Sequence, residues 1–316
     1  MNPKPAYTIA QQIQQLKDRK MLFNDEDSAT HFLSTISYYR LKGYWWDMQS
    51  DRVRHIFHPN SNFETVIERY TFDRHLKLIL FDAIERIEIA LRTKMIYHMS
   101  LTYGALWYLD TSLFADQVKH AAHLAHIRRE FGYSQEIFIK DHKRRHPLAQ
   151  PESWKILEVV SMGTLSKVYK NIKHQLPKKT SIAKEMGLHL HSELSSWLEA
   201  IVYVRNIIAH HSRLWSRNMV KKPKDNIANP MNDWFNIPLT DVQKKKPFLI
   251  ISTLVYLSNN VTPGHHIKDK ILELFNDNPN LPIYKLGFLN NWEQQPLWRD
   301  NSNKKGCLPF GFYKKK

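Results

Sequence analysis

Cysteine is almost absent from this sequence, and glycine is scarce. The single cysteine, Cys307, excludes a disulfide within the chain and a metal cluster built from several cysteines. Only 9 of the 316 residues are glycine, and few segments alternate apolar and polar side chains as a half-buried strand does. These absences favour a helical protein of a reducing compartment.

Long apolar runs are missing as well. Residues 248–257 are apolar, but they are fewer than the roughly 18 residues that a membrane-spanning helix needs. Residues 1–8 lack the apolar core of a secretory signal. We therefore expect a cytoplasmic protein with no membrane partner.

Acidic residues are outnumbered by basic ones. The chain carries 46 lysines and arginines against 30 aspartates and glutamates, which gives a net charge of +16. A charge of this size raises the local concentration of polyanions and speeds their association, so it points to nucleic acid or an anionic surface. The hydrophobic fraction of 42% supports a normal buried core and argues against disorder.

Helical periodicity is common, and it is clearest between residues 73 and 101. Apolar residues recur there every three or four positions, which builds one stripe along a helix. The members of this stripe are Leu76, Ile79, Leu80, Ala83, Ile84, Ile87, Leu91 and Met95. Residues 192–209 form a second strong helical pattern, whereas residues 221–246 are rich in Pro, Asn and Lys and predict a long loop.

The predicted class is therefore all-α, with helices packed as a bundle. We divide the chain into three regions. Residues 1–60 form a helical region that packs on the bundle, and residues 61–220 form the central helical domain. Residues 221–316 combine the basic loop, two further helices and an irregular aromatic tail.

The most informative segment lies at the end of the second helical pattern. Arg205 is followed directly by Asn206 and, five positions on, by His210. Histidine exchanges protons near neutral pH, and the arginine fork fits phosphate oxygens. Together they supply proton transfer and charge stabilisation, which is what RNA cleavage needs without a metal. Asn206 would position His210 or a phosphate oxygen by hydrogen bonding.

These three residues resemble the Arg-x4–6-His motif of HEPN ribonucleases, and other blocks resemble the abortive-infection (Abi) F/D-like branch of that superfamily. The blocks are residues 38–45 (YYRLKGYW), Phe72-Asp73-Arg74 with residues 82–92 (DAIERIEIALR), and Leu286-Gly287-Phe288 with Trp292, Leu297 and Trp298. The resemblance implies a HEPN-type helical bundle with N-terminal and C-terminal extensions. It also implies an endoribonuclease of phage defence or toxin-like function that leaves 2′,3′-cyclic phosphate and 5′-hydroxyl ends.

The resemblance further implies partners. Relatives form homodimers in which two motifs face each other and build a composite site, and they occur with a small structured RNA that restrains them. The spacing favours a site shared between two chains, since a five-residue step places Arg205 and His210 well apart around a straight helix. The alternative is a non-catalytic RNA-binding or adaptor protein on the same scaffold, and DNA binding is a third reading.

Several residues near the motif leave choices open. His211 also satisfies the spacing and is expected to support His210, together with Arg213. Arg92 and His98 form a second Arg-x5-His arrangement, which a packed or surface helix explains better than catalysis. Some histidines have metal-like spacing, namely His120, His123, His126, His265 and His266. No carboxylate or cysteine pattern accompanies them, so we expect no metal and no other cofactor.

Basic residues outside the motif are candidates for holding RNA. Arg40 and Lys42 lie among aromatic residues, a combination that binds single strands, although Trp45 and Trp46 are expected to belong to the core. The remaining candidates are Lys143, Arg144, Arg145, Arg217, Lys221 and Lys222. The sequence does not reveal which of them share a face.

Overall fold

A computed structural model of the chain describes residues 5–299. Thirteen α-helices lie within this range, with a single two-stranded antiparallel sheet, so the all-α prediction is confirmed for the described residues. The N-terminal elements are α1 (Ile9–Asp18), α2 (Glu26–Thr35), α3 (Tyr38–Trp45), β1 (Gln49–Asp51) and β2 (Ile56–Phe57). The central elements are α4 (Phe63–Tyr103), α5 (Gln117–Tyr133), α6 (Ile137–Arg145), α7 (Ser153–Ile156), α8 (Met162–Asn171), α9 (Pro177–Glu185) and α10 (His191–Ala209). The last helices are α11 (Asp241–Lys245), α12 (Pro247–Val261) and α13 (Ile267–Asn276).

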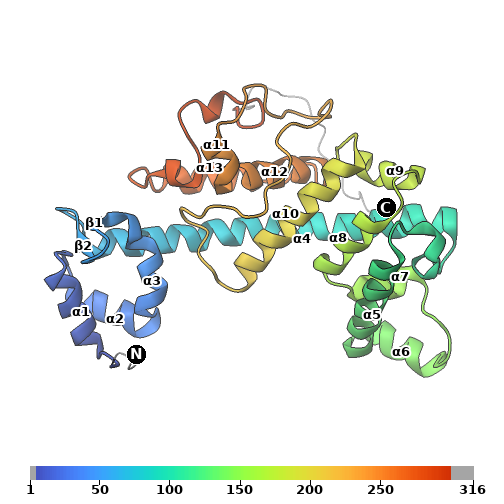
Figure 1. Cartoon of the computed structure of the whole chain (residues 1–316), viewed down its shortest axis with the longest axis horizontal. Helices are drawn as coiled ribbons and strands as arrows, with labels where there is room; N and C mark the ends of the chain where they lie inside the picture. The colour runs from blue at the N-terminus through green and yellow to red at the C-terminus, as the bar shows by residue number, and fades with distance from the viewer. Residues whose placement is uncertain (1–4, 300–316) are drawn as a thin grey trace, which may run out of the picture.

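Helix α4 is the axis of the molecule. It has 41 residues and is therefore about 60 Å long, and it runs across the whole width of Figure 1. Asn62 caps its start by accepting a hydrogen bond from the Thr65 backbone nitrogen at 2.8 Å, and Gly104, with φ of +88°, ends it. The helix begins ten residues before the predicted start because Phe63 and Val66 extend the buried stripe without a break.

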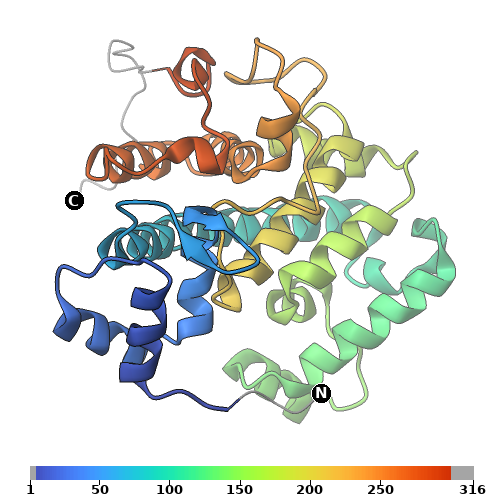
Figure 2. The ribbon, with the colours of Figure 1, turned by 60° about the vertical axis from the view of Figure 1, so that its left-hand side comes forward.

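The other helices pack around α4 in groups. Helices α12 and α13 lie along one side of it and the N-terminal helices lie on the other, as Figures 1 and 2 both show. Helix α3 packs at the beginning of α4, whereas α7 reaches its end, where the Ser100 and Ser153 hydroxyls share a hydrogen bond of 2.6 Å. The predicted C-terminal region therefore shares the central helix with the rest of the protein.

Lys179, on α9, is a buried cation. Its ammonium group donates to the Lys170 carbonyl at 3.0 Å and to the Ile172 carbonyl at 2.5 Å, where α8 ends. These contacts satisfy carbonyls that a helix end leaves without an intrahelical partner. Among the described residues no carboxylate pairs with Lys179, and burial lowers the pKa of its amine to about 8.

We expect the stability of the fold to depend on the titration of Lys179. Between pH 8 and about 10.5 the unfolded chain keeps a proton that the native state releases, so the free energy of unfolding rises with pH in this window. Urea unfolding measured across this range should show a weaker rise for Lys179→Met than for the unmodified chain. Lys184→Met, at an exposed position of the same helix, is the control and should leave the profile unchanged. Identical profiles for both variants would contradict the assignment.

Candidate functional site

Helix α10 ends in a tight turn that carries the two histidines of the motif. The His211 nitrogen donates to the Ile208 carbonyl and the Ser212 nitrogen donates to the Ile207 carbonyl, both at 2.9 Å. This is the Schellman arrangement, which needs a left-handed residue and usually has glycine there. His211 takes this position with φ of +53°. A left-handed conformation costs a residue with a side chain roughly 1–2 kcal/mol, so neighbouring contacts must hold the turn.

Two cations from distant parts of the sequence hold the turn. The Arg40 guanidinium, from α3, donates to the His211 carbonyl at 2.5 Å. The Lys77 ammonium, from α4, donates to the Ser212 carbonyl at 3.2 Å. The backbone carbonyls of the turn therefore accept hydrogen bonds from both α3 and α4, and these bonds fix the turn between the two helices.

Asp73 fixes the segment that follows the turn. Its side chain is fully buried on α4, and its carboxylate accepts hydrogen bonds from the Trp215 nitrogen at 2.6 Å and the Leu214 nitrogen at 3.2 Å. The same carboxylate accepts the Tyr44 hydroxyl at 2.7 Å and pairs with Lys77 at 3.1 Å. Burial and the Asp73 charge raise the pKa of the Tyr44 hydroxyl, which stays a donor.

Arg213 packs against α3 at the position of a glycine. A β-carbon on Gly43 would lie 3.0 Å from the Arg213 Cδ, so a larger residue there would push the arginine away. The Arg213 guanidinium donates to the Trp215 carbonyl, and burial lowers the pKa of this guanidinium. The sequence predicts a role for Arg213 in support of catalysis; in the structure this residue packs against Gly43 and donates to the backbone of its own turn.

A cavity of about 680 Å³ lies between α3, the first half of α4 and the end of α10. Its lining consists of Arg40, Tyr70, Arg74, Lys77, Leu78, Phe81, Ile208, Ala209 and His211. Four of these side chains are basic or can become so, and no carboxylate is among them. An anion with an apolar part fits such a lining.

The structure places the motif residues differently around this cavity. Arg205 lies four residues before Ala209, about 40° away around the helix, and so on the face that borders the cavity. Within α10 geometry, His210 lies about 140° from Arg205. The Arg205, Asn206 and His210 side chains have no partner among residues 5–299, and Asn206 and His210 are exposed. One chain thus brings Arg205 and His211 to one side and leaves His210 apart from them.

The other predicted RNA-binding residues fall into two groups. Arg40 lines the cavity, and Lys42 lies on α3 with its ammonium 5.6 Å from the ring of Trp46, which is 44% exposed. The prediction of a core role was correct for Trp45 and wrong for Trp46, because Trp46 falls where α3 ends. Arg217 is half-buried beyond the turn.

The second group has other partners or lies elsewhere. Lys221 pairs with Glu199 at 2.6 Å, and Lys222 is exposed. The basic run on α6 lies beside α7, at the opposite end of α4 from α3 (Figure 1). In this run Arg144 and Arg145 both pair with Asp141, and Lys143 donates to the carbonyls of residues 131 and 132.

The sequence did not single out Arg74, Lys77, Tyr70 and Phe81 as site residues. Arg74 belongs to one of the resembling blocks, and Lys77 lies four residues after Asp73, a spacing that is typical of an ordinary ion pair within a helix. The signal that could have identified Lys77 is its partner, because Asp73 lies on the buried, mainly apolar stripe of α4. A charged residue on a buried stripe needs polar partners from elsewhere in the fold.

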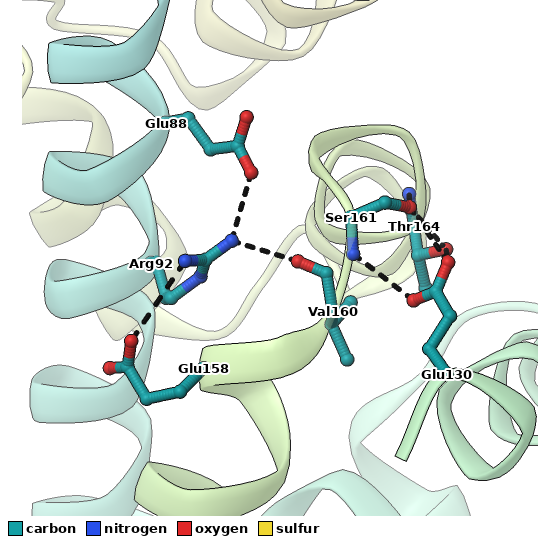
Figure 3. Close-up of polar contacts among 7 residues, drawn as sticks. All are labelled: Glu88, Arg92, Glu130, Glu158, Val160, Ser161 and Thr164. Carbon is teal, nitrogen blue, oxygen red and sulfur yellow. Dashed lines mark hydrogen bonds and ion pairs between the residues drawn. The ribbon is translucent and has the colours of Figure 1, made fainter. Parts of the chain in front are cut away.

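The second arrangement, Arg92 and His98, has a structural explanation. Figure 3 shows the Arg92 guanidinium between Glu88, at 2.9 Å, and the Val160 carbonyl, at 2.8 Å. Glu130 then accepts hydrogen bonds from the backbone nitrogen and the hydroxyl of Ser161 at the start of α8. His98 pairs with Glu185 at 2.7 Å. The contacts of Arg92 with Val160 and of His98 with Glu185 tie α4 to its neighbours, as the reading of a packed or surface helix predicts.

The family model described as Abi-like protein matches residues 31–216. The chain belongs to the Abi-like family. The family description points to an abortive-infection protein. The matched range begins before α3 and ends one residue after Trp215, so it contains all three elements that build the cavity. No curated protein and no solved structure matches the chain.

Within residues 5–299, no three His, Cys, Asp or Glu side chains gather as a group that could hold a metal ion. In the same range, none of the helices combines the length and the apolar character needed to cross a bilayer.

Removal of the Asp73 carboxylate should destabilise the chain far more than removal of a partly exposed carboxylate of the same helix. Asp73→Ala leaves Lys77 and two backbone nitrogens without their buried partner, and loss of one member of such a pair costs about 3–5 kcal/mol. Asp82→Ala breaks the partly exposed pairs with Arg86 and Lys270 and should cost less than about 1 kcal/mol for each pair. Urea unfolding followed by circular dichroism measures both. Equal losses would contradict a central role for Asp73.

Proposed function

We propose that this Abi-like chain is a metal-independent endoribonuclease of an abortive-infection system, with its site at the α3, α4 and α10 cavity. The observation that carries the proposal is the cationic lining of this cavity, which includes His211 and lies one helical turn from Arg205. The net charge of +16 supports a polyanionic substrate.

The reaction uses the nucleophile that RNA itself supplies. A histidine takes the proton of a 2′-hydroxyl, the oxygen forms a bond to the adjacent phosphorus, and the bond from phosphorus to the 5′-oxygen breaks. A second histidine gives a proton to the departing 5′-oxygen. The products are a 2′,3′-cyclic phosphate and a 5′-hydroxyl, and Arg205 stabilises the charge that grows on the phosphate.

A composite site of two chains extends this proposal. Because Arg205 and His210 diverge around α10, the His210 of one chain would act on RNA held by the Arg205 of its partner. An isologous dimer presents the same patch from both chains and so creates two such sites. We further propose that a small structured RNA occupies the cationic surface and restrains the activity.

The same divergence favours one rival. A chain whose Arg205 and His210 never meet would bind RNA without cutting it, as an adaptor. DNA binding is the other reading, and it predicts no preference for strands that carry a 2′-hydroxyl.

The motif variants test the reaction. We expect Arg205→Ala, His210→Ala and His211→Ala each to slow cleavage of a single-stranded RNA, the histidine variants by about 10²–10⁴-fold, because general acid–base groups contribute factors of this size. RNA affinity should change little in His210→Ala, because His210 lies outside the cavity lining. His126→Ala, at an exposed position of α5, is the matched control and should cut at the normal rate. Full activity of His210→Ala and His211→Ala together would refute the mechanism, and so would equal cleavage of DNA.

A mixing experiment tests the shared site. Arg205→Ala chains and His210→Ala chains are inactive alone, but a mixed dimer keeps one site with both residues intact if the site spans two chains. We expect mixing to restore part of the cleavage, measured as release of 5′-hydroxyl ends. A mixture as inactive as its components would assign Arg205 and His210 to the same chain.

A further inference from the structure

The lining of the cavity has a set of apolar side chains, which we call the floor, as well as a set of cationic side chains, which we call the rim. Tyr70, Leu78 and Phe81 contribute from α4, and Ile208 and Ala209 contribute from α10. Leu78 is 57% exposed and Phe81 is 42% exposed, so the described chain leaves these side chains uncovered. The cavity volume of about 680 Å³ lies within the range of small-ligand sites. Phosphate contacts alone do not account for an aromatic floor.

The cations of the rim differ in what they can still bind. Arg40 and Lys77 already donate to carbonyls of the turn after α10, and Lys77 also pairs with Asp73. Arg74 is exposed and has no partner among residues 5–299. Arg74 is therefore the guanidinium that is free to hold a phosphate at the edge of the aromatic floor.

We infer that the cavity is a base-binding pocket, in which one unpaired RNA base stacks on Phe81 while Arg74 holds a neighbouring phosphate. Every base has an aromatic face, and aromatic side chains beside cations bind single strands by stacking. A base within a double helix is covered by its neighbours and cannot reach Phe81. The pocket therefore selects RNA that is unpaired at this point.

A second copy of the chain is a poorer occupant of this pocket. A two-fold axis through the cavity would bring Arg40, Arg74 and Lys77 against the same three residues of the partner. Like charges in contact oppose association, whereas a strand of RNA neutralises them. Charge complementarity thus favours RNA over a direct protein contact at this place.

The position of the stacked base relative to the cleaved phosphate rests on the proposed nuclease function. Because His211 lines the pocket and Arg205 lies one helical turn from it, the stacked base belongs to a nucleotide next to the phosphate that is cut. The substrate class is then RNA with an unpaired nucleotide at the cleavage point, such as a loop or a single strand.

The test measures binding without cleavage. The probe is a short single-stranded oligonucleotide with every 2′-hydroxyl methylated, which cannot form a cyclic phosphate. Phe81→Ala should weaken its binding about 5- to 150-fold, which is the usual value of one stacked base. Phe81→Tyr keeps the ring and should bind normally. Ile89→Ala, at a 52% exposed position two turns along α4 and outside the cavity, is the matched control and should also bind normally.

Two further measurements make the test specific. The same probe annealed to its complement should bind equally to the unmodified chain and to Phe81→Ala. Arg74→Ala should reduce the slope of affinity against salt concentration by about one phosphate contact.

The outcomes separate this inference from the nuclease proposal. Unchanged single-strand affinity of Phe81→Ala would overturn the pocket even if the chain cuts RNA, and so would a change in oligomeric mass without a change in affinity. A Phe81-dependent affinity in a chain that never cuts unmodified RNA would keep the pocket and reject the nuclease.

Discussion

The buried carboxylate of Asp73 is the interaction on which the site depends. A carboxylate without water is costly unless charges and hydrogen bonds replace its hydration. Asp73 obtains them from the Tyr44 hydroxyl of α3, from Lys77 of its own helix, and from two backbone nitrogens beyond α10. The carboxylate is satisfied only when these three segments meet, so it couples the shape of the motif turn to the packing of α3 on α4. The end of the family match directly after Trp215 agrees with this coupling.

Much of the fold could be predicted because its causes are local. The stripe of α4, the cap at Asn62 and the apolar face of α10 each depend on residues that are close together in the sequence. The geometry of the turn could not be predicted in this way. The two hydrogen bonds that hold it, from Arg40 and from Lys77, join residues that lie 171 and 135 positions apart. The periodicity of the sequence does not predict such long-range contacts. The left-handed backbone conformation of His211 could not be predicted either, since the residue with this conformation at a helix end is usually glycine.

The candidate site was predicted in part for the same reason. The Arg205 helix was found from chemistry and spacing, but the wall opposite it was not. The sequence of a basic segment does not show which carboxylates or apolar side chains will lie near it in the fold. Basic residues that are alike in sequence therefore have different partners in the structure. Arg144 pairs with Asp141 at the far end of α4, whereas Arg74, a single residue within a helical pattern, is left free at the cavity. Free charge near an apolar floor is a property of the assembled fold.

The proposed nuclease has a consequence for how its activity is controlled. A chain that separates Arg205 from His210 is a poor catalyst alone, and the cationic rim opposes the approach of a second copy. Within about a Debye length of 8–10 Å this repulsion is only partly screened by salt. RNA lying in the groove removes it, because each phosphate replaces a like-charge contact by an attractive one. In this scheme RNA is both the substrate and the molecule that brings the two chains together. A structured RNA that covers the cationic surface but has no unpaired base would keep the dimer assembled without being cleaved.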